Sequence, residues 1–293
     1  MSKVHQIVTD TIITRLNAVL ENGEKMGQWE KPFAAGPAGG HYNVISGKAY
    51  RGVNQFLLTL AGGSNCWGTF KQWKSKNASV RKGEHGSMIV FYKTSTYEDN
   101  DGNEKTVPVL RYYRVFASDQ VDGYDAPATT TAPINPVDAI AAVDRFIASL
   151  EIETREASGR AFYSPSRDFV SMPPQNDFSK TSTSTATENY YSTLLHELTH
   201  ATGHKSRCDR QLGGFFGDPE YAFEELVAEL GAAMACASLG ITDAVRDDHC
   251  RYIRSWLRAI KDNPKAIFKA ASLAQKAIDW MVDQQENQTA IAA

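Results

Sequence analysis

The first half of the chain combines short stretches of helical spacing with one pair of strand-like stretches. Apolar residues recur every three or four positions over 4–26, which predicts an amphipathic helix. We expect a buried helix at 55–60 and another short helix that begins at 67, where aromatic residues stand three apart. Segments 87–93 and 107–116 are expected to be strands. The acidic segment between them, 98–105, indicates that the two strands form a hairpin.

Helical periodicity dominates the second half. Two short segments, 161–163 and 168–172, are the exception and are expected to be strands that flank a turn. The first helix is expected to start at Pro136 or Val137. The predicted helices of this half are 139–150, 188–202, 219–239, 244–261 and 264–286.

A segment rich in Pro, Thr and Ala, 125–136, has no hydrophobic period and is expected to be a linker. It separates residues 1–124 from residues 137–286, and 287–293 are expected to form a disordered tail. The order of elements predicts an α+β protein of two domains. The first would combine an antiparallel sheet with helices, and the second would be mostly helical.

Composition narrows the class of protein. The chain is 42% hydrophobic and 22% charged, which is the range of a globular protein. No window of 18 residues is wholly apolar, so neither a transmembrane helix nor a membrane partner is expected. The N-terminus lacks the order of a signal peptide, and the four Cys form no CxxC pair. We therefore expect a cytoplasmic protein with reduced thiols.

Charge is distributed unevenly. The net charge is −3, yet residues 1–124 carry 15 Lys and Arg against 11 Asp and Glu, and 48–93 carry eight basic residues against one acidic residue. Aromatic residues lie among these cations, a mixture that binds single-stranded nucleic acid. Each aromatic residue taken alone is more commonly part of a core. The candidate DNA-binding residues are Lys48, Tyr50, Arg51, Trp67, Lys71, Trp73, Lys74, Lys76, Arg81 and Lys82.

The sequence His-Glu-Leu-Thr-His at 196–200 places two histidines four positions apart. On a helix this spacing is about 400° of rotation, so His196 and His200 leave the same face and can bind one metal ion. Glu197 lies beside the first histidine and can act as a general base on a water at that ion. A catalytic site of this kind needs a third protein ligand.

The next predicted helix supplies candidates for the third ligand. Glu225 and Glu229 stand four apart among apolar residues, so one can bind the metal while the other orients a ligand histidine. His204 continues the spacing of His200, but it follows Gly203, where the helix is expected to end. We favour Glu225, since ligands usually sit on regular elements. The donors favour Zn²⁺, with Mn²⁺ or another divalent metal as alternatives.

Together the motif and the second helix resemble the zincin metallopeptidases of the gluzincin type. By that resemblance Glu225 matches the third metal ligand, Glu229 matches the acid that orients a ligand histidine, and Glu197 would be the catalytic residue. An oxyanion partner would also be needed. The candidates, among which the sequence does not choose, are Tyr163, Arg167, Tyr190, Tyr191 and His249.

Four segments of the first half form a second set of motifs: 28-QWEKPF-33, 43-NVISGKAYRGVNQFLL-58, 67-WGTFKQW-73 and 81-RKGEHG-86. They resemble the N-terminal single-stranded-DNA-binding domain of the ArdC antirestriction proteins of conjugative plasmids. In that family the domain precedes a zincin-like metallopeptidase domain, as expected here. The resemblance implies a protein in the cytoplasm of a bacterial recipient cell. It would bind incoming single-stranded DNA and protect it from restriction endonucleases during conjugation.

Three functions stay open. In the first, the metal domain is a peptidase whose substrate is a restriction endonuclease or another protein. In the second, the metal site is structural, and the protein acts by shielding DNA or by contacting a restriction enzyme. In the third, the chain is a metal-dependent nuclease. The third ranks last, because nucleases favour carboxylate-rich Mg²⁺ sites over a His/His/Glu set.

Overall fold

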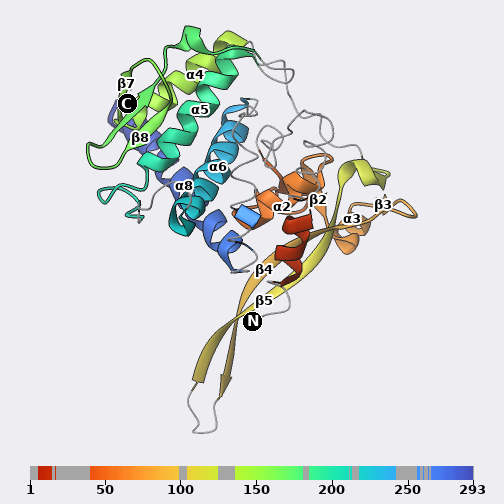
Figure 1. The fold of residues 1–293 in the computed structure, drawn as a ribbon. Helices are drawn as coiled ribbons and strands as arrows, with labels where there is room; N and C mark the ends of the chain where they lie inside the picture. The colour runs from red at the N-terminus through yellow and green to blue at the C-terminus, as the bar shows by residue number, and fades with distance from the viewer. Residues whose placement is uncertain are drawn as a thin grey trace.

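The computed structural model of the chain has a mixed α+β fold, as the sequence predicted (Figure 1). Residues 6–14 are helical, within the predicted helix 4–26. The predicted linker lies outside the described residues except for Pro136, and so does most of the predicted helix 244–261. The described residues are 6–14, 17, 40–98, 104–124, 136–180, 185–210, 212, 218–241, 256–257, 260, 263 and 265–292.

A four-stranded sheet with the order β1-β2-β5-β4 lies at the centre of the N-terminal region. The short strand β1 (Tyr42–Asn43) runs parallel to β2 (Cys66–Gly68). The other two pairs are antiparallel. Strands β4 (Ser87–Glu98) and β5 (Glu104–Ala117) are the predicted hairpin, and each is longer than its hydrophobic pattern indicated.

Helix α2 (Val53–Ala61) contains the predicted buried helix. Helix α3 (Phe70–Ser75) begins three residues later than predicted, because Thr69 is its N-cap and closes a capping box with Gln72. Trp67 therefore belongs to strand β2, and its assignment to this helix is corrected. A two-stranded sheet and a 3₁₀ turn complete the region: β3 (Ser79–Val80), η1 (Ser118–Gln120) and β6 (Val121–Asp122).

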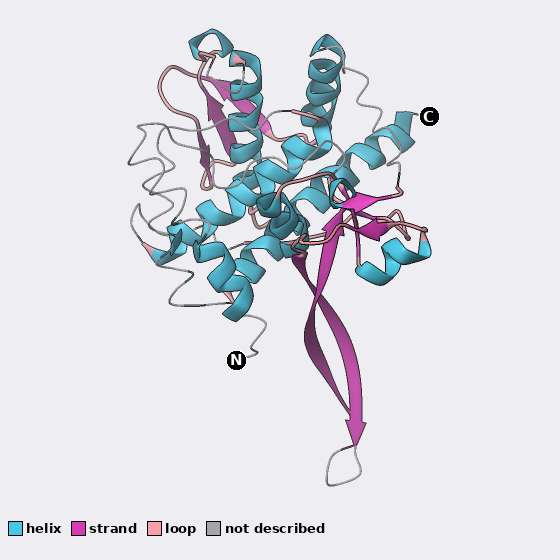
Figure 2. Ribbon diagram, turned by 90° about the vertical axis from the view of Figure 1, so that its right-hand side faces the viewer, coloured by secondary structure: helices cyan, strands magenta, loops and turns pink. Residues whose placement is uncertain are grey.

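The hairpin of β4 and β5 projects from the body of the molecule as a long twisted ribbon (Figures 1 and 2). Its register runs without interruption from Ser87 opposite Val115 to Glu98 opposite Glu104. Near the body, Asn54 of α2 binds the backbone of Val90 in both directions: its amide donates to the carbonyl, and its side-chain oxygen accepts from the N–H, each at 2.7 Å. The base of the ribbon is thereby held on α2.

The C-terminal region contains a small sheet of order β7-β9-β8 and four described helices. Strand β7 was missed because all four of its residues are polar and exposed, so it has no hydrophobic alternation. The elements are α4 (Pro136–Ser149), β7 (Glu153–Glu156), β8 (Phe162–Ser164), β9 (Phe169–Met172), η2 (Gln175–Asp177), α5 (Ala186–Ala201), α6 (Pro219–Leu239) and α8 (Ala266–Ala292).

The end of α8 corrects one prediction. The helix continues through residues 287–292, where a disordered tail was expected. These residues carry no apolar period, but propagating an existing helix requires far less than starting one. Gln288 also donates to Glu151 at 2.9 Å, which ties this end to the residues after α4.

Two large cores organise the described residues. One lies inside the C-terminal region, where residues of α4, α5, α6 and α8 form one cluster with residues of β8 and β9. The other joins the two regions: Leu226, Val227 and Leu230 of α6 pack in one cluster with Phe56 of α2 and Val90 of β4. Helix α6 is thus part of a core shared with the N-terminal region. Among the described residues, no helix is long and apolar enough to span a membrane.

Candidate metal centre

The His-Glu-Leu-Thr-His motif lies in the last two turns of helix α5. This helix starts at a capping box, in which Thr185 and Glu188 satisfy each other's backbone N–H groups. His196 and Glu197 are buried, and His200 is partly buried. The predicted helix 188–202 is confirmed in type and in its placement of both histidines on one face.

Helix α6 packs against α5 and begins and ends where the sequence predicted. Pro219 is its first residue, and Gly240 follows its last residue with a left-handed φ of 68°. The two helices are in tight contact at Gly231, where an added Cβ would lie 2.4 Å from Cγ2 of Thr199. This contact requires glycine and brings Glu225 toward the histidines.

Three of the predicted residues converge. The Nε2 atoms of His196 and His200 lie 3.6 Å and 3.5 Å from the two carboxylate oxygens of Glu225. All three donor groups fall within 4.8 Å of one another. Donors about 2.0–2.2 Å from a tetrahedral ion are about 3.3–3.6 Å apart. The donor set and its spacing therefore fit a divalent metal ion.

The opposite nitrogen of each imidazole faces another carboxylate. Nδ1 of His196 is buried and lies 3.5 Å from Oε1 of Glu229, the residue predicted to orient a ligand. Nδ1 of His200 lies 3.3 Å from Oε1 of Glu224. A carboxylate can only accept, so the Nδ1–H tautomer points at each acid and leaves Nε2 for the ion.

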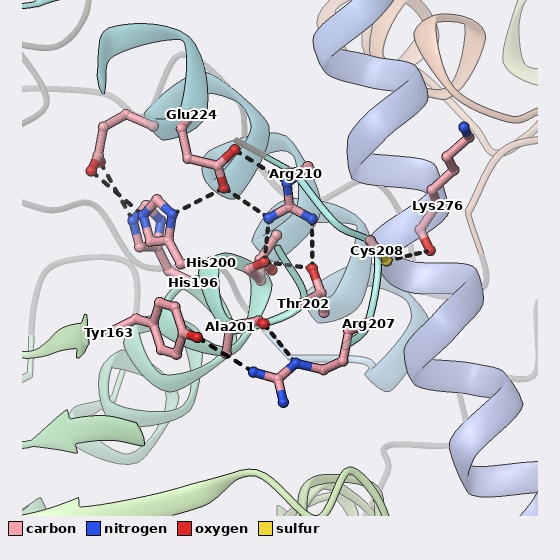
Figure 3. A network of polar contacts seen from close by, with 12 residues as sticks. Tyr163, His196, His200, Ala201, Thr202, Arg207, Cys208, Arg210, Glu224 and Lys276 are labelled. Carbon is pink, nitrogen blue, oxygen red and sulfur yellow. Dashed lines mark hydrogen bonds and ion pairs between the residues drawn. The ribbon is translucent and has the colours of Figure 1, made fainter. Parts of the chain in front are cut away.

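Glu224 is a site residue that sequence reasoning missed. Its carboxylate receives two hydrogen bonds from Arg210, at 2.7 Å and 3.1 Å (Figure 3). Arg210 is itself buried and donates to Oγ1 of Thr202 and to the backbone oxygen of Thr199, both at 2.7 Å. The only signal in the sequence was its place beside Glu225 in a largely apolar helix.

The electrostatics of the site favour a cation. Burial alone would lower the pKa of His200, but the hydrogen bonds and charges of Glu224 and Glu225 raise that pKa to about 10. Burial alone would raise the pKa of each glutamate, yet the neighbouring histidines, with Arg210 beside Glu224, hold both below their usual range. These carboxylates stay ionised beside a protonated His200, and a bound metal ion would replace that proton as their positive partner.

His204 does not join the three donor groups. Its Nδ1 lies 2.8 Å from the hydroxyl of Ser206 and 3.7 Å from Asp168. Among the candidate oxyanion partners, the hydroxyls of Tyr163 and Tyr191 donate to Asp168 and Asp144. The ring of Tyr190 packs edge-on against Phe178, and His249 lies outside the described residues.

Two of the predicted DNA-binding residues are part of the interior. Trp67 and Trp73 are 1% and 0% exposed, and their indole N–H groups donate to His41 and to the carbonyl of Phe116. This corrects their prediction as stacking residues, because a buried ring offers no face to a base. Both rings are buried because β2 and α3 turn these side chains toward core clusters. Composition alone does not show which side of an element faces the core.

The other predicted DNA-binding residues reach the surface to different extents. Tyr50 is half-buried, and its hydroxyl accepts from Asn43 at 3.2 Å. Arg51 pairs with Asp279 of α8 at 2.5 Å, and Arg81 pairs with Glu84 at 3.0 Å. The exposed lysines are Lys48, Lys71, Lys74, Lys76 and Lys82.

Fold and site together fit a zincin-like metallopeptidase domain that follows a smaller α+β region. Residues 141–273 match a family described as zincin-like metallopeptidase, and residues 2–116 match the N-terminal domain of anti-restriction factor ArdC. Crystal structures of antirestriction protein ArdC from plasmid R388 cover 98% of this chain and 99% of their own. The metal-free form is 37% identical with a TM-score of 0.74, and the Mn(II)-bound form is 34% identical with a TM-score of 0.71. The chain belongs to the ArdC antirestriction family.

Two further proteins are similar to this chain in sequence. Protein y4eC of Sinorhizobium fredii is 43% identical over 258 residues, which span 84% of this chain and 81% of that protein. DNA primase TraC of Escherichia coli is 32% identical over 305 residues, which span 97% of this chain and 20% of TraC. The same two-part unit therefore also occurs within a much longer protein.

Proposed function

We propose that the protein is an antirestriction factor that binds single-stranded DNA and holds a divalent metal ion at His196, His200 and Glu225. The convergence of these three donor groups within 4.8 Å carries the metal part of the proposal. Membership of the ArdC family and the likeness to a protein named DNA primase support the DNA part. In the cell, it would protect incoming plasmid DNA from restriction endonucleases during conjugation.

The donor set favours Zn²⁺, since two imidazoles and one carboxylate are its usual catalytic ligands. Mn²⁺ is the alternative, because a related ArdC structure carries Mn(II). When bound, such an ion would act as a Lewis acid and lower the pKa of a water molecule toward about 7. Glu224 and Glu229 would hold the two imidazoles in the tautomer that presents Nε2.

Glu197 is the proposed general base. It is buried beside His196 on the same helix, one position out of line with the ligands. From there its carboxylate would accept a proton from the attacking water and return it to the leaving amine of a peptide. Burial keeps bulk water from competing for that proton. A protein substrate, such as a restriction endonuclease, is the partner that this chemistry fits.

A structural metal site is the second candidate function. The observation that favours it is the shared core, in which α6 carries Glu225 on one face and packs Leu226, Val227 and Leu230 against the N-terminal region on another. An ion at Glu225 would then stabilise the packing of the two regions without any hydrolysis. Antirestriction would follow from DNA binding alone.

One set of variants separates these readings: wild type, Glu197→Gln and His196→Ala. Each is loaded with Zn²⁺ or Mn²⁺ and assayed for bound metal, for cleavage of casein, for cleavage of single-stranded DNA, and for transfer of unmodified plasmid DNA into a restricting recipient. We expect Glu197→Gln to retain metal and to lose casein cleavage and protection together. His196→Ala is expected to lose metal as well.

Any other outcome would support a different function or contradict the proposal. Full protection by Glu197→Gln would exclude hydrolysis from the antirestriction role and leave the structural metal site. Metal-dependent cleavage of DNA that Glu197→Gln abolishes would assign a nuclease. A wild-type protein that holds neither ion would overturn the metal part of the proposal.

A further inference from the structure

The ribbon of β4 and β5 carries an exposed aromatic face that lies outside the metal site and includes none of the ten predicted DNA-binding residues. Phe91 pairs directly with Arg111, and Ile89 pairs directly with Tyr113. Directly opposed residues of an antiparallel pair point to the same side of the sheet, and alternate residues along a strand do so too. Phe91, Arg111 and Tyr113 therefore share one face, and Lys93 continues it.

The two faces of the ribbon have different surroundings. On the opposite face, Val90 is buried, and Met88 and Leu110 pack against the core shared with α6. On the first face, Val115 and Ile89 at the near end reach a core, and the residues farther along do not belong to a described core cluster. Phe91 is 57% exposed and Tyr113 is 44% exposed. Folding leaves these rings in contact with water, so packing within the described chain does not account for them.

Charge indicates what could cover this face. Residues 87–97 and 105–117 contain four basic residues, Lys93, Lys105, Arg111 and Arg114, and no acidic residue. The four acidic residues of the hairpin, Glu98, Asp99, Asp101 and Glu104, all stand between positions 98 and 104, so the part around Phe91 and Arg111 is locally basic. Such a surface attracts a polyanion such as the phosphate backbone of DNA.

The geometry suits unpaired bases. Phe91 and Tyr113 are diagonal neighbours, because Tyr113 lies two residues beyond the partner of Phe91. Diagonal neighbours are about 7–8 Å apart. This is roughly twice the rise of 3.4 Å per nucleotide of one DNA strand. Two rings at that separation can stack on one or two unpaired bases, while Arg111 and Lys93 reach the phosphates.

We propose that the face of the ribbon formed by Phe91, Lys93, Arg111 and Tyr113 is the base-stacking surface for single-stranded DNA. The inference rests on the proposed DNA-binding function and locates it. It also replaces the buried Trp67 and Trp73 as the source of stacking. Duplex DNA should bind less well, because its bases already stack on one another and expose no face to the rings.

The test measures the affinity of the full-length protein for a fluorescent oligothymidine and for a duplex of the same length, by anisotropy at several salt concentrations. Phe91→Ala and Tyr113→Ala should each weaken oligothymidine binding about 10-fold and together about 100-fold. The salt dependence should keep its slope, because no phosphate contact is lost. Arg111→Ala should instead reduce the slope by about 0.7.

Two control variants test whether a loss of DNA binding comes from this face of the ribbon. Phe162→Ala removes an aromatic side chain that is 41% exposed in the C-terminal region, and it should leave the affinity unchanged. Phe91→Trp keeps a stacking ring and should bind at least as well as wild type. The unfolding temperature of every variant is measured, so that a loss of binding is attributed to the surface only in a folded protein.

The outcomes are distinct. If the wild type does not bind oligothymidine, the proposed DNA-binding function fails. If the wild type binds and the folded double variant binds equally well, this inference fails, and the exposed lysines of 48–82 become the binding surface. If the double variant loses self-association in sedimentation while its DNA affinity is unchanged, the face is a contact between copies of the chain, which also overturns the inference.

Discussion

The Nδ1 atom of His200 lies 3.3 Å from Oε1 of Glu224, and Arg210 donates to both oxygens of the same carboxylate. The imidazole is thus fixed at one nitrogen while the other faces Glu225. Three side chains, His200 of α5, Glu224 of α6 and Arg210 of the segment between them, thus form one chain of contacts that would orient His200 as a ligand.

Glu224→Gln should weaken metal binding by about 10- to 100-fold, the usual effect of losing the acid behind a ligand histidine. It should also cost roughly 3 kcal/mol of unfolding free energy, because Arg210 remains buried with its charge unpaired. Competition with a chelating dye and chemical denaturation measure the two effects. Glu220→Gln, at an exposed position of the same helix, is the control. Equal affinity in both variants would contradict an orienting role for Glu224.

Adding metal should stabilise the wild type. An ion that binds only the folded chain adds about 2.7 kcal/mol at 100 times its dissociation constant. We expect Zn²⁺ or Mn²⁺ to raise the unfolding temperature of wild type and of Glu197→Gln, but not of His196→Ala. Differential scanning fluorimetry with and without EDTA measures this. A similar rise in His196→Ala would place the bound ion elsewhere.

Gly231→Ala should separate the two helices that carry the metal donors. The new methyl group would lie 2.4 Å from Cγ2 of Thr199, so one helix must shift. Overpacking of this kind costs about 1–3 kcal/mol, and metal affinity should fall with it. The double variant with Thr199→Ala removes the clashing methyl and should recover part of both losses. Strictly additive effects in this double-mutant cycle would exclude the proposed clash.

Acid should weaken the N-terminal core through His41. Its Nδ1 accepts from the indole of Trp67 at 2.9 Å, and burial lowers its pKa from 6.5 to about 4. The unfolded chain then binds the proton more readily, so the contribution of His41 is complete above pH 6.5 and disappears as the pH falls toward 4. The loss amounts to about 3 kcal/mol at most.

Urea unfolding at pH 7 and pH 5 measures this dependence. In His41→Gln, whose side chain can still accept from Trp67 but does not titrate, the difference between the two pH values should be smaller than in wild type. If the two proteins lose the same stability between pH 7 and pH 5, the buried neutral state assigned to His41 is wrong.

The local pattern of the sequence determined much of the fold and most of the site. The bounds of α6, Pro219–Leu239, follow from a proline, a hydrophobic period and a glycine that lie next to one another in the chain. The pairing of His196 with His200 and of Glu225 with Glu229 follows from the helical repeat alone. These features can be predicted without knowing which segments pack together, because the geometry of a single helix determines which side chains share a face.

Only the tertiary structure decided which side chains meet across elements. Glu224 became a site residue because Arg210 and His200 reach it from other parts of the fold, and nothing in its immediate neighbours distinguishes it from a surface glutamate. Trp73 and Phe91 are both aromatic residues near lysines, yet one is buried and the other is 57% exposed. Burial depends on what packs against a residue, and those contacts join positions far apart in the sequence. Local periodicity therefore predicted three donor residues that converge in the structure, while long-range packing decided which side chains contact them and which aromatic rings stay exposed.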